Sequence, residues 1–160
     1  MKSSNPSIYE KLTIESADGK KTADISAGAF LVSYYENLFS PIVTAKIVVI
    51  NTGDSIKGED GKMQSLYNGF PLRGGERVVL KISGNSKPNK EGLDFSKDPK
   101  DYFYVASITN VLIDSGKETF TLNLVPREAI TNETTRVGKK FPSSQPISDS
   151  VENILKDYLK

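Results

Sequence analysis

The sequence predicts a mainly β protein, built as a small antiparallel barrel that is flanked by one C-terminal helix. Strand-like runs follow one another with turns between them and do not alternate with helical segments, which indicates an antiparallel sheet. About six or seven strands are expected, and a sheet of this size protects its edges by closing or stacking. Helical periodicity is clear only near the C-terminus.

The N-terminal part contains two expected strands. Residues 1–7 are polar and are predicted to be a flexible N-terminus. Residues 8–15 form a first extended segment, which ends in the turn chemistry of residues 18–20. Residues 29–35 alternate between two faces with a period of two, and this alternation predicts a strand.

The strongest central strand is expected over residues 42–50. One of its faces is wholly apolar, and this face consists of Val43, Ala45, Ile47 and Val49. Residues 51–70 form a long loop in which a short helix is predicted around Leu66 and Tyr67. Another strand runs over residues 77–82, and residues 83–100 are expected to be a long polar connection.

A β-hairpin is predicted over residues 101–125. Its turn lies at residues 114–117, and the returning strand places Phe120, Leu122 and Leu124 on one face. The outgoing strand is apolar on both faces, so we expect it to have neighbouring strands on both sides. Pro126 ends the returning strand, because proline cannot donate to a strand ladder.

The C-terminal segment is expected to be a loop followed by a helix. A short helical turn at residues 127–130 leads into a polar loop over residues 131–140. Ser148 or Asp149 then caps a helix. Its apolar face has helical spacing and consists of Val151, Ile154, Leu155, Tyr158 and Leu159. We therefore divide the chain into a β domain at residues 8–145 and a C-terminal helix at residues 146–160.

The order of these motifs resembles the first tail-tube-like barrel domain of baseplate hub proteins from contractile-tailed, myovirus-type phages. Those proteins are related to the hub part of type VI secretion spikes. The segment 71–82, PLRGGERVVLKI, is similar to the family's strand after a double glycine. The other matching residues lie towards the C-terminus: Glu128, Asn132, Glu133, Thr135, Arg136, Val137, Lys139, Phe141, Ile147, Ser148, Asp149, Val151, Ile154 and Leu155. The resemblance covers most of residues 29–160.

The resemblance implies a structural protein of the virion, located in the tail baseplate and assembled in the host cytoplasm. In the family, three subunits with two barrels each form a pseudo-sixfold ring that joins the tail tube to the central spike. The implied partners are further copies in a trimer or pseudo-hexameric ring, the tube and spike proteins, and other baseplate proteins. This chain has room for one barrel, so three interpretations are open. It is the first barrel of a longer hub with a second domain beyond residue 160, a single-domain relative, or a subunit that forms a six-membered ring by itself.

The expected contact residues lie beside the long loops. They are Arg73, Gly74, Gly75 and Glu76 at the rim of the barrel, and Arg136, Lys139 and Lys140 in the C-terminal loop. The competing interpretation of the second group is a solvated basic loop, because small charge clusters are usually solvated.

Composition argues against several other classes of function. The chain has 160 residues, a net charge of +1 and no histidine or cysteine. The missing residue types exclude imidazole- or thiol-based catalysis and zinc sites built on imidazole or thiolate ligands. We expect no catalytic residue, no cofactor and no metal. No apolar run is long enough to span a membrane, and the chain lacks the basic excess of a specific nucleic-acid-binding protein.

Two alternatives remain open at this stage. The aromatic residues Tyr34, Tyr35, Tyr102, Phe103 and Tyr104 could form a stacking platform in a small β-barrel module that binds single-stranded nucleic acid or oligosaccharide. The preferred interpretation is that these residues pack in the core or at a subunit interface, because aromatic residues are favoured in strands and no basic groove accompanies them. A carboxylate-based glycan hydrolase would need two buried acids about 5 to 9 Å apart. The pairs Glu59 with Asp60 and Asp98 with Asp101 lie in polar loops, which does not favour that role.

Overall fold

The computed structural model describes residues 7–58, 61–84 and 91–159. It contains two compact units, Met1–Pro126 and Arg127–Lys160, which are treated separately below. The predicted flexible N-terminus lies outside the described residues apart from Ser7. The acidic pair Glu59 and Asp60 also lies outside them.

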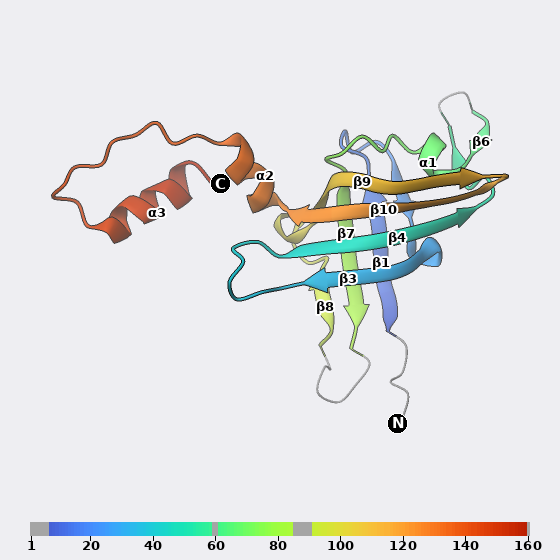
Figure 1. The fold of residues 1–160 in the computed structure, drawn as a ribbon, viewed down its shortest axis with the longest axis horizontal. Coiled ribbons are helices and arrows are strands. Elements are labelled where there is room, and N and C mark those ends of the chain that lie inside the picture. Colours follow the sequence, from blue (N-terminus) through green and yellow to red (C-terminus); the bar gives the residue numbers. More distant parts are fainter. Residues whose placement is uncertain (1–6, 59–60, 85–90, 160) are drawn as a thin grey trace. The chain divides into compact units, whose positions relative to one another are not determined.

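The first unit is built around one antiparallel sheet (Figure 1). The strand order is β2-β1-β7-β9-β10-β4-β3, and β8 also pairs with β7. The strands are β1 (Ile8–Glu15), β2 (Thr22–Asp24), β3 (Ala29–Tyr35), β4 (Thr44–Thr52), β7 (Arg77–Ser83), β8 (Leu93–Phe95), β9 (Phe103–Asp114) and β10 (Lys117–Pro126). The predicted antiparallel, mainly β fold is therefore confirmed.

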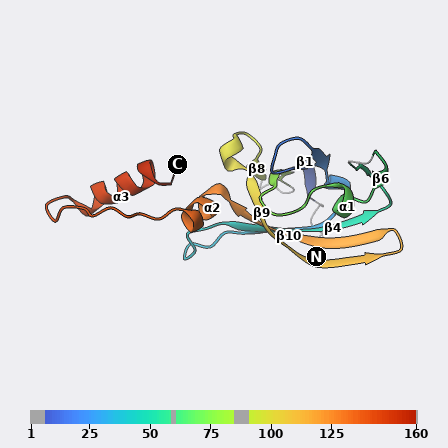
Figure 2. The same ribbon diagram turned by 90° about the horizontal axis from the view of Figure 1, so that it is seen from above.

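The sheet folds over itself into two layers. Strands β3, β4, β10 and β9 lie side by side, and β1 and β7 cross them in the second layer (Figures 1 and 2). The layers are joined where β7 pairs with the start of β9, with Arg77 opposite Tyr104 and Val78 opposite Phe103. The end strands β2 and β3 are connected by the short 3-10 turn η1 (Ser26–Gly28), and no ladder joins these two strands within the described residues.

The core consists of apolar side chains that the two layers share. The predicted face of β4 is buried at Ala45, Ile47 and Val49. The predicted face of β10 is also buried, at Phe120, Leu122 and Leu124. From the crossing strands and from the start of β9 the core receives Leu12, Ile14, Val78, Leu80, Phe103 and Val105. Burial of one face of each strand explains the period-two pattern of the sequence.

The two long connections contain more structure than the sequence predicts. Residues 51–70 include the small strand pair β5 (Ile56–Lys57) and β6 (Met63–Gln64), followed by α1 (Leu66–Gly69), which confirms the predicted short helix. Residues 83–100 were expected to be a plain connection, but they contain β8 and the short 3-10 turn η2 (Pro99–Asp101). Strand β8 forms because Phe95 pairs with Leu80, a long-range contact that local pattern does not reveal.

The prediction for the outgoing hairpin strand is wrong over most of its length. Strand β9 pairs with β10 throughout, but β7 reaches only Phe103 and Tyr104. Beyond that point β9 is an edge strand, and its apolar residues Leu112 and Ile113 are exposed. The cause is the crossing direction of β7, which leaves the plane of the β9 layer after two residue pairs.

The second unit consists of two helices and a connection. Helix α2 (Arg127–Thr134) is one turn longer than predicted, so the polar loop begins after Thr134 and not at residue 131. Helix α3 (Ile147–Asp157) begins before both predicted caps, with Pro146 at the N-cap position and no side-chain cap. The hydroxyl of Ser148 instead donates to Asp149 Oδ1 at 3.2 Å. None of the helices in the described residues is long and apolar enough to cross a membrane.

Candidate functional site

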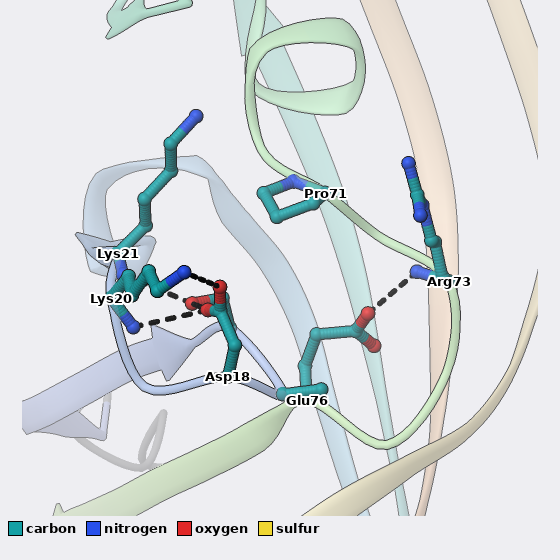
Figure 3. Close-up of a pocket in the computed structure, with 8 residues that line it drawn as sticks. Asp18, Lys20, Lys21, Pro71, Arg73 and Glu76 are labelled. Atoms are coloured by element: carbon teal, nitrogen blue, oxygen red, sulfur yellow. Dashed lines mark hydrogen bonds and ion pairs between the residues drawn. The ribbon is translucent and has the colours of Figure 1, made fainter. Parts of the chain in front are cut away.

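A hollow of about 310 Å³ lies in the first unit between the β1–β2 turn and the loop before β7 (Figure 3). The turn contributes Ser16, Ala17, Asp18, Lys20 and Lys21, and the loop contributes Pro71, Arg73 and Glu76. The hollow therefore brings charged residues together from two segments that are far apart in the sequence.

The turn is held by a network around Ser16, which is buried. Its hydroxyl donates to Asp18 Oδ1 at 2.7 Å and accepts from the backbone N–H of Lys21 at 2.9 Å. Asp18 also accepts from the backbone N–H of Lys20 at 3.1 Å, and it lies 3.6 Å from Lys20 Nζ. These hydrogen bonds, the one from Ser16 above all, lower the pKa of Asp18 from its ordinary value, so this carboxylate is already well satisfied.

The opposite wall is organised by Glu76, which is buried despite its charge. Its carboxylate accepts from the backbone N–H of Arg73 at 2.5 Å and of Gly74 at 3.0 Å. Gly74 and Gly75 have φ values of +96° and +85°, a conformation that glycine adopts without strain. Gly75 N–H then donates to Val105 O at 2.8 Å, which fastens the loop to β9.

The carboxylates of Asp18 and Glu76 thus accept hydrogen bonds from the residues that line the hollow. In contrast, the cations Lys21 and Arg73 have no carboxylate partner within the described residues. In the part of the chain that the structure describes, Lys21 Nζ donates only to the uncharged Gly69 O, at 3.3 Å. The guanidinium of Arg73 has no hydrogen bond or ion pair within the described residues. Figure 3 shows Lys21 and Arg73 on either side of Pro71, with their charged ends directed to the same side.

The predicted contact residues fall into the two separate units. Arg73, Gly74, Gly75 and Glu76 form one continuous loop at the hollow, in which Arg73 is exposed and Glu76 points inward.

The second predicted group, Arg136, Lys139 and Lys140, lies in the α2–α3 connection, where all three side chains are exposed. Arg136 Nη1 donates to Glu133 O at 3.0 Å, and Lys139 Nζ lies 5.5 Å from the ring centre of Phe141. Two of the three cations are therefore engaged within their own segment.

Sequence reasoning located the turn at residues 18–20 but did not predict that Ser16, Asp18 and Lys21 line a site. The signal that could have found them is the segment SADGKK, in which a Ser-x-Asp pair precedes a glycine turn and two lysines. That segment predicts a turn, but only the fold shows that it faces Arg73.

Open sheet edges form a second candidate surface. In the layer β3-β4-β10-β9, the two outer strands each carry large exposed apolar side chains. These side chains are Phe30, Leu31 and Tyr35 on β3, and Val111, Leu112 and Ile113 on β9. Large apolar residues on an unpaired strand are a liability in an isolated chain, so such an edge points to a partner.

The aromatic residues that suggested a stacking platform are largely engaged within the fold. Phe103 is buried, and Phe95 joins it to Tyr34 through ring contacts with centroid distances of 5.0 and 5.6 Å. Tyr102 and Tyr104 are half-buried, which leaves Tyr35 as the exposed member of the five.

Comparison with protein-family models, with curated proteins and with solved structures finds no match. Within the described residues, no group of three or more histidine, cysteine, aspartate or glutamate side chains could hold a metal ion.

Proposed function

We propose that this chain is a ring-forming structural component of a phage tail baseplate hub, in which its first unit is a tail-tube-like barrel that joins the tail tube to the central spike. The observation that carries the proposal is the layer β3-β4-β10-β9. Within the described residues no strand pairs with the outer side of β3 or with the outer side of β9 beyond Tyr104, and both strands carry exposed apolar side chains. The motif resemblance described above supplies the family.

The strand directions in this layer suit a ring. Strands β3 and β4, β4 and β10, and β10 and β9 are antiparallel in turn, so β3 and β9 run in opposite directions. Strand β9 of one copy can therefore lie beside β3 of the next and continue the antiparallel pattern. Such a contact joins two different surfaces, and repeated contacts of this kind close into rings when the rotation permits.

The side chains at the two edges supply the driving force for this contact. Phe30 on β3 is 73% exposed and Leu112 on β9 is 70% exposed. Burying apolar area contributes about 25 cal/mol per Å², so two apolar edges gain considerably by meeting. Edge pairing would also satisfy backbone groups in the part of β9 that lies beyond its short contact with β7.

Light scattering of the purified chain over a range of concentrations tests this proposal. A trimer or hexamer is expected, and its mass distinguishes a hub-like from a tube-like ring. The variant Leu112→Lys should shift the chain towards monomer, because a lysine at the edge opposes strand pairing. Met63→Lys is the matched control, since Met63 is also exposed but lies in the separate β5–β6 pair. A wild-type chain that stays monomeric at all concentrations contradicts self-assembly of this chain.

A further inference from the structure

In the hollow between residues 16–21 and 71–76, the acidic side chains have hydrogen-bond partners, whereas two of the basic side chains have no carboxylate partner. Asp18 and Glu76 receive their hydrogen bonds from the turn and the loop themselves. Lys21 and Arg73 have no carboxylate partner in the described part of the chain. The hollow therefore offers two cations to an outside group and keeps its own anions occupied.

We propose that this hollow binds a carboxylate group presented by an acidic segment of a partner protein, with Arg73 and Lys21 as its two cationic contacts. A guanidinium presents a planar fork of donors that fits both oxygens of a carboxylate. Lys21 adds a second charge from the other side of Pro71 (Figure 3). A volume of about 310 Å³ admits the end of an aspartate or glutamate side chain with its bridging waters.

The charge balance favours a carboxylate over a chain of phosphates. Asp18 and Glu76 line the same hollow as Lys21 and Arg73, so a phosphate, which carries up to two negative charges on one group, meets more repulsion within the site than a carboxylate, which carries one. The whole chain has a net charge of only +1, so no basic excess extends the attraction beyond the hollow. A single carboxylate on a protein partner is therefore the better match.

The site is organised before any ligand arrives. The Glu76 carboxylate accepts hydrogen bonds from the backbone N–H groups of Arg73 and Gly74. The Ser16 hydroxyl accepts one from the backbone N–H of Lys21. Only the Arg73 side chain and the end of Lys21 must be ordered on binding, which keeps the entropic cost small.

This inference deepens the contact role of Arg73 in the proposed function, but its test uses a free peptide and does not need a ring. A fluorescein-labelled oligoglutamate peptide is titrated with the full chain at low salt, and fluorescence anisotropy reports binding. An oligoglutamine peptide of equal length is the neutral control. Free glutamate, inorganic phosphate and an oligothymidylate strand are added as competitors.

We expect Arg73→Gln and Lys21→Gln each to weaken oligoglutamate binding by on the order of tenfold, since each removes a charge-assisted contact. Lys46→Gln is the matched control, because Lys46 is an exposed cation on β4 and does not line the hollow. The Arg73 side chain makes no hydrogen bond within the described residues, so Arg73→Gln should fold normally, and a thermal unfolding curve checks this.

Three results would overturn the inference. They are an equal loss of affinity in Arg73→Gln and Lys46→Gln, equal binding of the glutamine peptide, and stronger competition by the oligonucleotide than by free glutamate. Equal losses in Arg73→Gln and Lys46→Gln would indicate a general electrostatic attraction between the chain and the peptide. Stronger competition by the oligonucleotide would indicate a phosphate-binding site. Light scattering of the same samples separates this outcome from the proposed function: peptide binding by a monomer contradicts the ring alone, and a ring without peptide binding contradicts this inference alone.

Discussion

The backbone N–H of Tyr67 donates to Glu118 Oε1 at 2.8 Å, which fastens the first turn of α1 to the start of β10. The same oxygen accepts from Asn51 Nδ2 at 3.0 Å, at the end of β4. Glu118 is buried, and within the described residues its Oε2 has no hydrogen-bond partner. One carboxylate oxygen therefore connects three segments that are separate in the sequence.

Glu118→Ala should lower the free energy of unfolding by about 2 to 3 kcal/mol, because it leaves the Tyr67 N–H and the Asn51 amide without their acceptor. Glu118→Gln keeps one acceptor oxygen and should retain more stability than the alanine variant. Urea denaturation of the three proteins measures both effects. Equal losses in the two variants would show that the hydrogen bonds of Oε1 do not stabilise the fold.

Leu122→Ala should cost about 2 to 5 kcal/mol in the free energy of unfolding, as is usual for a buried leucine. Leu112→Ala on the partner strand of the same hairpin should cost less than about 0.5 kcal/mol in the monomer, because Leu112 is exposed. Chemical denaturation at low protein concentration makes the comparison. Similar costs at the two positions would contradict the edge position of β9.

Gly75→Ala should lower the free energy of unfolding by about 1 kcal/mol. The φ of +85° at Gly75 is strained for any residue with a Cβ atom, although no atom lies within 4 Å of the added carbon. Gly138→Ala is the control, since its Cβ would also meet nothing within 4 Å and no positive φ applies there. Thermal unfolding compares the two variants with the parent chain. A neutral Gly75→Ala variant would show that the loop relaxes without cost.

The pair Glu10 and Lys81 should contribute pH-dependent stability. Lys81 Nζ lies 2.5 Å from Glu10 Oε2, and hydrogen bonds from Lys81 and then from Ser83 lower the pKa of Glu10. A lowered pKa in the folded state stabilises the fold above the ordinary carboxyl value of about 4.3, and the stabilisation is lost as the pH falls through the folded value. Both side chains are partly exposed, so we expect a small effect.

The pH prediction is checked by following the Glu10 side-chain carboxyl in an NMR titration. Lys81→Gln should raise the pKa of Glu10 towards its ordinary value, because it removes the positive charge and the strongest donor. Lys11→Gln removes a neighbouring exposed cation of β1 and should change the pKa of Glu10 much less. An unchanged pKa in Lys81→Gln would contradict the assigned cause.

The sequence alone was sufficient for the elements whose patterns are local. Alternation along residues 42–50 and 118–125 located two core strands, because burial of one sheet face requires a period of two. The i, i+3, i+4 spacing located α3, although the helix begins at Ile147, ahead of both predicted caps, since Pro146 presets the backbone with a φ of −55°.

Features that depend on distant segments were decided only by the tertiary structure. The apolar pattern of β9 predicts neighbours on both sides, but β7 crosses the layer and leaves Leu112 at an open edge. Glu118 reads as an ordinary surface acid in the sequence, and it is buried because the distant Tyr67 N–H and Asn51 amide converge on it. Glu76 was expected at an exposed rim, but the structure buries it, and it accepts from the neighbouring N–H groups of Arg73 and Gly74. In the same way, the turn at Ser16 and the loop at Arg73 become one site only when β1 pairs with β7, since long-range pairing and not local periodicity brings them together.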